Sequence, residues 1–269
     1  MAQEEMKHVL DGYKVLDFTQ VLAGPTVTRL MAEMGAEIIK VELAPGGDLS
    51  RGLPFLRNGR SGYFIQQNRG KKSLCLDAKN AKALDILKQL IGKVDVVVEN
   101  FAPGAISRLG LGYETVKQLN PRAVMCSVSA FGQTGPLSKL PGYDYIAQAY
   151  AGVTYMIGEP EGAPYFPMLG IGDVSTGVHA VAAIACALLY RERTEKGQHL
   201  DISLLDAYFH CHEMSVELYS ASGGTIKPKR SGTQHYALAP IGLFKGRETY
   251  IFIMALAHQW VPFCKAMGK

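Results

Sequence analysis

Short apolar runs with the composition of β-strands alternate with segments that have the apolar spacing of helices. This alternation limits the possible folds more than any other feature, because strands separated by helices form βαβ units with parallel strands and right-handed crossovers. We therefore predict an α/β fold with a doubly wound, mostly parallel, Rossmann-like sheet. The predicted strands of this part are Lys14–Thr19, Glu37–Glu42, Ser73–Asp77, Val94–Glu99 and Ala123–Ser129.

The helices are predicted from apolar residues that recur every three or four positions. Residues 43–67 lack this spacing, are rich in Gly, Pro and Arg, and are predicted to form a long loop,. The first strand is not followed by a GxGxxG sequence, so a dinucleotide fingerprint is absent,. The principal predicted helices are Thr26–Met34, Ala81–Ile91, Tyr113–Leu119, Asp144–Ala151, Val174–Tyr190 and Leu204–Tyr219.

Composition changes near residue 220 and predicts how the chain is divided. Residues 221–230 are small, polar and basic, as is typical of a linker,. We therefore predict a large α/β domain at 1–220, a linker at 221–230, and the start of a smaller α+β domain at 231–269. A strand pair and a final helix from about His258 are expected in this last part.

Charge and cysteine usage exclude several functional classes. A net charge of +4 suits a small anionic ligand but is too weak to indicate nucleic acid,. The five cysteines are odd in number and never form a CxxC pair, which favours a reducing, cytoplasmic location without disulfides,. No metal site is expected, because His210 and His212 on a helix would point about 200° apart. The apolar helix Val174–Tyr190 is shorter than the roughly 20 residues that cross a bilayer, so we predict a core helix and no membrane partner.

Asp173 lies between small residues, directly before this apolar helix. One interpretation is that Asp173 is the N-cap of the helix, since Asp is a preferred cap. The other is a carboxylate nucleophile kept ionised at the helix start, where the dipole would lower its pKa. Gly170 and Gly172 leave room for a ligand or another backbone to approach. The local sequence alone leaves both interpretations open.

Six short segments occur together and in order in one known family. The chain resembles the family III CoA-transferases, the group of formyl-CoA and carnitine CoA-transferases. One such segment would be weak, but six in order over nearly the whole length are specific. The segments are Val15–Thr19 with Ala23–Pro25, Gly35–Glu42, Asn68–Ser73, Val98–Gly104, Phe131–Pro136 and Gly172–Asp173.

The resemblance implies that Asp173 is the catalytic nucleophile. In the family, this carboxylate attacks an acyl-CoA thioester, forms a mixed anhydride and then an aspartyl-CoA thioester, and an acceptor acid completes the exchange. A carboxylate needs no general base for this attack if it is ionised and desolvated. Backbone N–H groups at the nearby glycines are expected to stabilise the oxyanion. Gln20 and Ala23 are placed in the loop that lines the family's active site.

The CoA contacts follow from the same resemblance. Asn100 and Phe101 lie where the family holds the adenine, and Phe101 would stack on the purine; its alternative is a place in the core. Arg108 matches an arginine that contacts CoA. Lys71 and Lys72 are placed to meet phosphates as point charges, and their alternative is a solvated basic pair.

Tyr143 separates the transferases from a related activity. The α-methylacyl-CoA racemases share the fold and pair their aspartate with a histidine in a Gly-His-Asp segment. Here the segment is Gly142-Tyr143-Asp144, and an unperturbed tyrosine with a pKa near ~10 is a poor base at neutral pH,. The sequence therefore favours a transferase, with a racemase-like epimerase and a non-catalytic acyl-CoA-binding protein as alternatives.

The resemblance also implies the partners. CoA and acyl-CoA are substrates rather than tightly bound cofactors, and the second substrate is a small carboxylic acid. Succinyl-CoA as donor and a dicarboxylate or carnitine-like acceptor are expected by analogy. Family members form interlocked homodimers and continue well past residue 269, so we expect the small domain to be incomplete here.

Overall fold

The computed structural model describes residues 7–269, and contacts within the chain divide them into two units. Residues 7–147 and 170–208 form the first unit, and residues 148–169 and 209–269 form the second. The division therefore does not fall at the predicted boundaries of the linker. Residues 222–230 contain no helix or strand.

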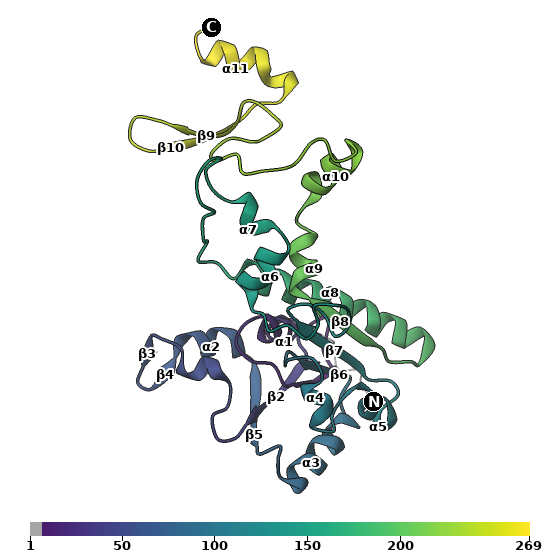
Figure 1. The fold of residues 1–269 in the computed structure, drawn as a ribbon. Helices are drawn as coiled ribbons and strands as arrows, with labels where there is room; N and C mark the ends of the chain where they lie inside the picture. Colours follow the sequence, from purple (N-terminus) through teal and green to yellow (C-terminus); the bar gives the residue numbers. More distant parts are fainter. Residues whose placement is uncertain (1–6) are drawn as a thin grey trace. The chain divides into compact units, whose positions relative to one another are not determined.

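The first unit is built on a six-stranded sheet in which every neighbouring pair is parallel (Figure 1). The strand order β5-β2-β1-β6-β7-β8 is the order 3-2-1-4-5-6 of a doubly wound sheet,. This confirms the predicted α/β fold. The six strands are β1 (Lys14–Asp17), β2 (Glu37–Leu43), β5 (Lys71–Leu76), β6 (Val96–Glu99), β7 (Val124–Ser129) and β8 (His199–Ser203).

The strand order reverses between β1 and β6, which are neighbours in the sheet. The chain leaves the two strands toward opposite sides at this point, so a crevice opens outside their carboxyl ends. Gln20 follows β1 and Asn100 follows β6 directly. The topology thus brings two predicted site residues, far apart in sequence, to one place.

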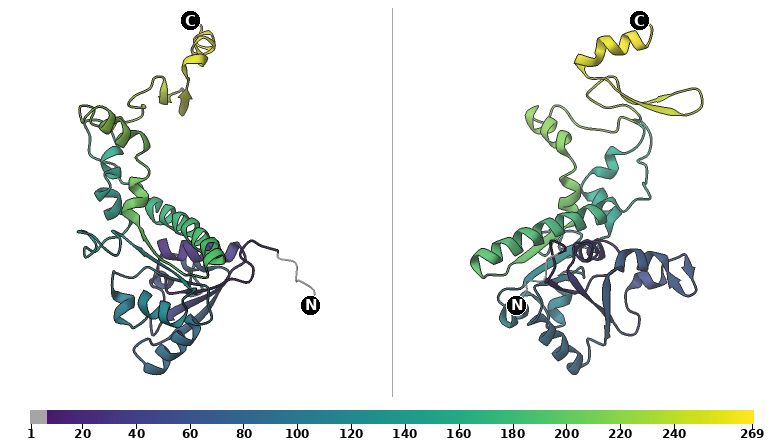
Figure 2. Two further views of the ribbon diagram at one scale, coloured as in Figure 1. Left: turned by 90° about the vertical axis from the view of Figure 1, so that its right-hand side faces the viewer. Right: turned by 180° about the vertical axis from the view of Figure 1, so that it is seen from behind.

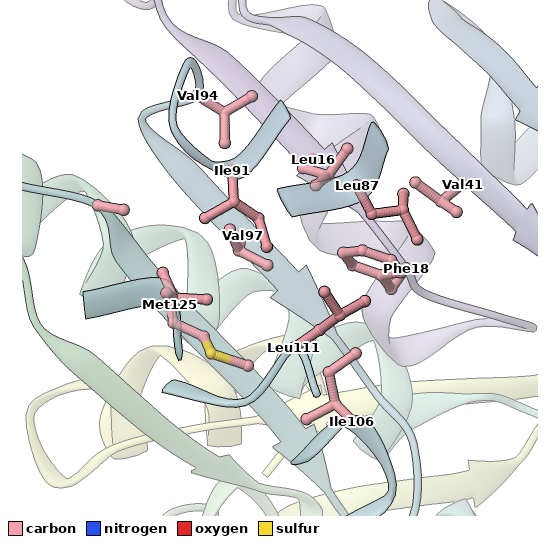
Figure 3. Close-up of a cluster of buried hydrophobic side chains, with 12 residues drawn as sticks. Leu16, Phe18, Val41, Leu87, Ile91, Val94, Val97, Ile106, Leu111 and Met125 are labelled. Atoms are coloured by element: carbon pink, nitrogen blue, oxygen red, sulfur yellow. The ribbon is translucent and has the colours of Figure 1, made fainter. Parts of the chain in front are cut away.

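Helices cover both faces of the sheet. On one face α1 (Ala23–Glu33) packs against α8 (Ile171–Thr194), and α8 lies on β7 and β8 (Figure 2). On the other face, α3 (Ala81–Ile91) and α5 (Tyr113–Leu119) enclose a fully apolar core (Figure 3). Truncating one of these buried leucines to alanine typically costs about 2–5 kcal/mol. The labelled core residues include Leu16, Phe18, Leu87, Ile91, Val97, Leu111 and Met125.

Helix α8 is longer than the predicted Val174–Tyr190. Its length and composition would suffice to cross a membrane. One side of it is nevertheless buried, including Thr176, Ala180 and Ile184, and it packs against α1 and the sheet. The other side exposes apolar residues such as Val174, Val178 and Leu189, so packing within the described residues accounts for only part of the apolar composition.

The long loop predicted at residues 43–67 is wrong, because the segment contains regular structure. It includes a 3₁₀ turn at Leu49–Gly52, the hairpin of β3 (Leu56–Arg57) and β4 (Arg60–Ser61), and α2 (Gly62–Asn68). Asn58 and Gly59 connect the hairpin with φ of 52° and 72°, as a two-residue primed turn requires,. These elements are short and mostly exposed, so they carry little apolar periodicity.

In the second unit, the predicted strand pair is confirmed as the antiparallel hairpin β9 (Ile241–Lys245) and β10 (Tyr250–Met254). The single helix predicted at Leu204–Tyr219 is wrong. The chain instead forms α9 (Leu204–Phe209) and α10 (Glu213–Ala221), and the His212 ring between them contacts the Ala151 carbonyl oxygen at 2.8 Å.

The remaining α-helices of the described residues, from both units, are α4 (Ala105–Arg108), α6 (Asp144–Tyr150), α7 (Val153–Met156) and α11 (Trp260–Ala266).

Candidate active site

A cavity of about 280 Å³ opens at the carboxyl ends of β1, β6 and β7, within the first unit. Its walls come from the loop after β1, the turn after β6, the end of β7, residues 140–143 and the start of α8. This is the crevice expected where the strand order reverses. The predicted site residues that line it are Gln20, Ala23, Asn100, Phe101, Tyr143 and Asp173.

Asp173 is the third residue of α8, and the N-cap position is Gly170. The interpretation of Asp173 as the N-cap is therefore wrong. The helix begins three residues earlier than a cap at position 173 would require, and its capping position carries no side chain. The Asp173 carboxylate lines the cavity instead.

The electrostatic setting of Asp173 also differs from the prediction. Burial, followed by the nearby charge of Asp144, raises the pKa of Asp173 to about 7. A helix dipole stabilises a charge in its first turn by only about 0.3–1 kcal/mol. The cost of removing a carboxylate from water, added to repulsion by a second carboxylate, exceeds this stabilisation. The expectation that the dipole lowers the pKa of Asp173 is therefore wrong.

The space beside the glycines is filled by protein rather than by a ligand. A Cβ atom on Gly172 would overlap the Tyr208 ring and the Asp144 carboxylate, and one on Gly170 would lie 2.6 Å from Leu22 Cδ2. The Gly172 N–H donates to Asp144 Oδ1 at 3.2 Å. The Gly172 amide is thus occupied and does not serve as the oxyanion donor expected from the sequence.

The loop after β1 is held from several sides. Asn100 binds both backbone groups of Gln20: its Oδ1 accepts from Gln20 N–H at 2.7 Å and its Nδ2 donates to Gln20 O at 2.9 Å. Val21 has φ of 68°, a strained conformation for a β-branched residue, and its N–H donates to Asp48 Oδ1 at 3.2 Å,. These bonds fix the wall of the cavity that leads into α1. They also occupy the Asn100 amide that was predicted to contact adenine.

Two buried ion pairs lie behind this loop. Lys40 Nζ is 2.9 Å from Asp48 Oδ2 and donates to Thr19 O at 2.6 Å. Lys71 Nζ is 3.0 Å from Asp17 Oδ2, and both of these side chains are almost fully buried. Burial alone would raise the pKa of Asp17, but the charges of Lys71 and Lys40 outweigh it and lower the pKa.

The predicted phosphate contact of Lys71 is not supported, because its ammonium is enclosed and paired with Asp17. Lys72 lies on the surface and pairs with Glu37 at 2.6 Å. Arg108 is exposed at the end of α4 and is not among the residues that line the cavity. Phe101 both lines the cavity and packs against the apolar core.

Ser129 of this region was not predicted as a site residue. Ser129, at the end of β7, lines the cavity, and its buried hydroxyl has no hydrogen-bond partner within residues 7–269. Burial, then the charge of Asp173, raises the pKa of Tyr63 to about 12, which places the phenol of α2 near that carboxylate. A serine at the end of an apolar strand gives no distinctive signal in sequence. Within the described residues, no three His, Cys, Asp or Glu side chains could hold a metal ion together.

A family model described as CoA-transferase family III matches residues 10–269. The chain belongs to this family. Succinyl-CoA:glutarate CoA-transferase from Mus musculus is 40% identical, over 96% of this chain and 59% of that protein. Succinyl-CoA:mesaconate CoA-transferase from Haloarcula hispanica is also 40% identical, over 97% of this chain and 67% of that protein. A crystal structure of a CAIB/BAIF family protein from Brucella suis superposes with a TM-score of 0.87 at 34% identity, over 98% of this chain and 70% of that one.

This family III chain spans about three fifths of the length of the mouse and human succinyl-CoA:glutarate CoA-transferases. The comparisons confirm the family and the α/β fold predicted from the sequence. The roles of individual residues stay predictions.

Proposed function

We propose that the protein transfers CoA from an acyl-CoA to a free carboxylic acid, with Asp173 as the covalent nucleophile. One observation carries this proposal. Asp173 lies in the cavity where the strand order reverses, and none of the ion pairs formed within residues 7–269 includes it. A desolvated carboxylate without a counterion is the form in which this group is a useful nucleophile.

The reaction proceeds through two covalent states of Asp173. A carboxylate oxygen bonds to the thioester carbon, the C–S bond breaks with its electron pair on sulfur, and a mixed anhydride remains. The CoA thiolate then attacks the Asp173 carbonyl carbon, which releases the donor acid and leaves an aspartyl-CoA thioester. The acceptor carboxylate reverses these two steps, so the new acyl-CoA departs and the Asp173 carboxylate is restored.

The start of α1 supplies donors for the oxyanion of these steps. The first N–H groups of a helix have no acceptor inside it, and α1 begins at Ala23 without a side-chain cap,. Leu22 and Ala23 both line the cavity, as does Ser129. We infer that these amides bind the tetrahedral oxyanion and that the Ser129 hydroxyl binds an oxygen of the acyl group or acid.

The names of the relatives suggest the substrates. The similar proteins from mouse and human are named as succinyl-CoA:glutarate CoA-transferases, and one from Haloarcula hispanica as a succinyl-CoA:mesaconate CoA-transferase. We propose succinyl-CoA as donor and a small dicarboxylate such as glutarate as acceptor. Stacking of adenine on Phe101, a CoA contact of Arg108, a homodimer and a cytoplasmic location stay predictions.

Trapping the covalent intermediate tests the proposal. The protein is incubated with succinyl-CoA, quenched in acid and digested, and the peptide that contains Asp173 is weighed by mass spectrometry. A succinyl or CoA adduct on this peptide, absent in Asp173→Asn, is expected. Binding of CoA without any adduct would indicate a binding protein, and deuterium exchange at the α-carbon of an acyl-CoA without transfer would indicate a racemase.

A further inference from the structure

A second carboxylate, which the reaction above does not use, lies beside the nucleophile. Asp144 begins α6 and is only 5% exposed. Its Oδ1 accepts the Gly172 N–H at 3.2 Å and also the hydroxyl of Tyr208, a side chain that is 1% exposed. Asp144 thus ties the first turn of α8, which carries Asp173, to a fully buried tyrosine of α9.

The other oxygen of Asp144, Oδ2, and the Asp173 side chain both lie close to Gly170. A Cβ atom on Gly170 would lie 3.8 Å from Asp144 Oδ2 and 4.0 Å from Asp173 Cβ, so both side chains flank this glycine. Asp144 Oδ2 is buried and has no hydrogen-bond partner within residues 7–269. None of the ion pairs in this part of the chain includes Asp144 or Asp173. Two acidic groups therefore share a confined space without a cation.

We propose, on the basis of the CoA transfer proposed above, that Asp144 is a positioning residue for Asp173. It fixes the first turn of α8 through Gly172 and Tyr208, and it places a like charge beside the reacting carboxylate. The two tasks use different oxygens, because Oδ1 receives both hydrogen bonds and Oδ2 receives none.

The like charge acts on the first covalent step. When an Asp173 oxygen bonds to the acyl carbon and the C–S bond breaks, the electron pair leaves with the CoA sulfur and Asp173 becomes a neutral anhydride. Repulsion between Asp144 and Asp173 exists only before this step. The protein thereby raises the free energy of the ionised nucleophile relative to the acylated state, at a site fixed by observed contacts. The same repulsion contributes to the raised pKa of Asp173.

Replacing Asp144 by asparagine separates charge from geometry. The amide oxygen of asparagine still accepts from Gly172 and Tyr208, whereas the negative charge is lost. We expect the midpoint of the Asp173 titration to fall by about one pH unit, which is about tenfold in proton affinity. The carboxyl ¹³C resonance of Asp173, assigned by its loss in Asp173→Asn, reports this midpoint. The acid limb of the kcat profile should move down with it, and adduct formation with succinyl-CoA at pH 8 should slow about tenfold.

Two controls isolate the charge. Asp85→Asn removes one exposed carboxylate on α3, across the sheet, and is expected to leave both the titration and the rate unchanged. Tyr208→Phe removes a donor to Asp144 but keeps the charge, so the Asp173 midpoint should stay or rise. Of the groups whose charge reaches Asp173, Tyr63 stays neutral in this range, because burial and Asp173 raise its pKa to about 12.

An unchanged Asp173 midpoint in folded Asp144→Asn would overturn the proposal. If that variant does not fold, a midpoint in Tyr208→Phe below the wild-type value would overturn it equally. The titration does not depend on turnover. A wild-type protein that forms no adduct would therefore refute the proposed function, while the titration would still decide whether Asp144 sets the state of Asp173.

Discussion

Helices α1 and α8 pack against each other and begin at the same cavity. The buried carboxylates near their two starts nevertheless have neighbours of opposite charge. At the start of α1 each buried carboxylate meets a lysine, as in Asp48 with Lys40 and Asp17 with Lys71. At the start of α8, Asp173 has a carboxylate for its neighbour. The pKa is lowered at Asp17 and Asp48, where lysines outweigh burial, and raised at Asp173, where nothing does. One region holds a loop in place, and the other holds the carboxylate that we propose as the nucleophile.

Removing the nucleophile gives the largest expected effect. In Asp173→Asn, CoA transfer should fall at least about 10⁴-fold, equivalent to ~5.5 kcal/mol of transition-state stabilisation. The physical reason is that an amide cannot form the anhydride. Steady-state transfer from succinyl-CoA to glutarate measures this loss. Activity retained within tenfold, with adducts on another residue, would assign the nucleophile elsewhere.

Breaking a buried ion pair near the start of α1 should lower the stability of the protein rather than its catalytic rate. Lys40→Met leaves Asp48 buried without its cation, which typically costs about 3–5 kcal/mol. Denaturant unfolding of the first unit measures this change. Lys72→Met removes a lysine that is 72% exposed and pairs on the surface, so its expected cost is below about 1 kcal/mol,. Equal losses in the two variants would contradict the distinction between buried and exposed pairs.

A variant of Asn100 tests whether the loop after β1 shapes the substrate site. Asn100→Ala removes two hydrogen bonds to Gln20 and should cost about 2 kcal/mol,. It should also raise the KM for acyl-CoA several-fold, because the cavity wall is released. Asn120 is a matched control, since its side chain donates to Ile91 O and Val94 O away from the cavity. Asn120→Ala should lose similar stability with no change in KM; a similar KM change in both would show a general loosening instead.

Much of this arrangement is predictable from the sequence, because it depends on topology. Alternating strands and helices dictate parallel strands, and parallel strands place their carboxyl ends at one edge. Gln20 and Asn100 follow strands, and Asp173 lies in the first turn of a helix. All three therefore line the same cavity. The hairpin at Asn58-Gly59 also carried a readable turn signal,.

The charge states were not predictable in the same way. The burial of Lys71 depends on its place in β5 and on Asp17 in β1, with β2 between them. The pKa of Asp173 depends on Asp144, which the sequence places in a different segment, and on burial that no local pattern reports. The strained Val21 gave no signal either, because β-branched residues rarely adopt positive φ,.

The last predicted effect has the opposite sign, a gain in stability from removing the unpaired charge. The folded pKa of Asp173, about 7, exceeds the value of about 3.9 expected for an unfolded chain,. The folded state therefore binds more protons between these values, and the stability of the wild type falls as the pH rises through this window. Asp173→Asn does not titrate, and a difference of about three pKa units corresponds to about 4 kcal/mol, so the variant should be more stable than wild type by up to about 4 kcal/mol at pH 8 and about equal to it near pH 4,. Urea unfolding at the two pH values measures the difference. A variant that is no more stable at pH 8 than the wild type would show that Asp173 carries no unpaired charge.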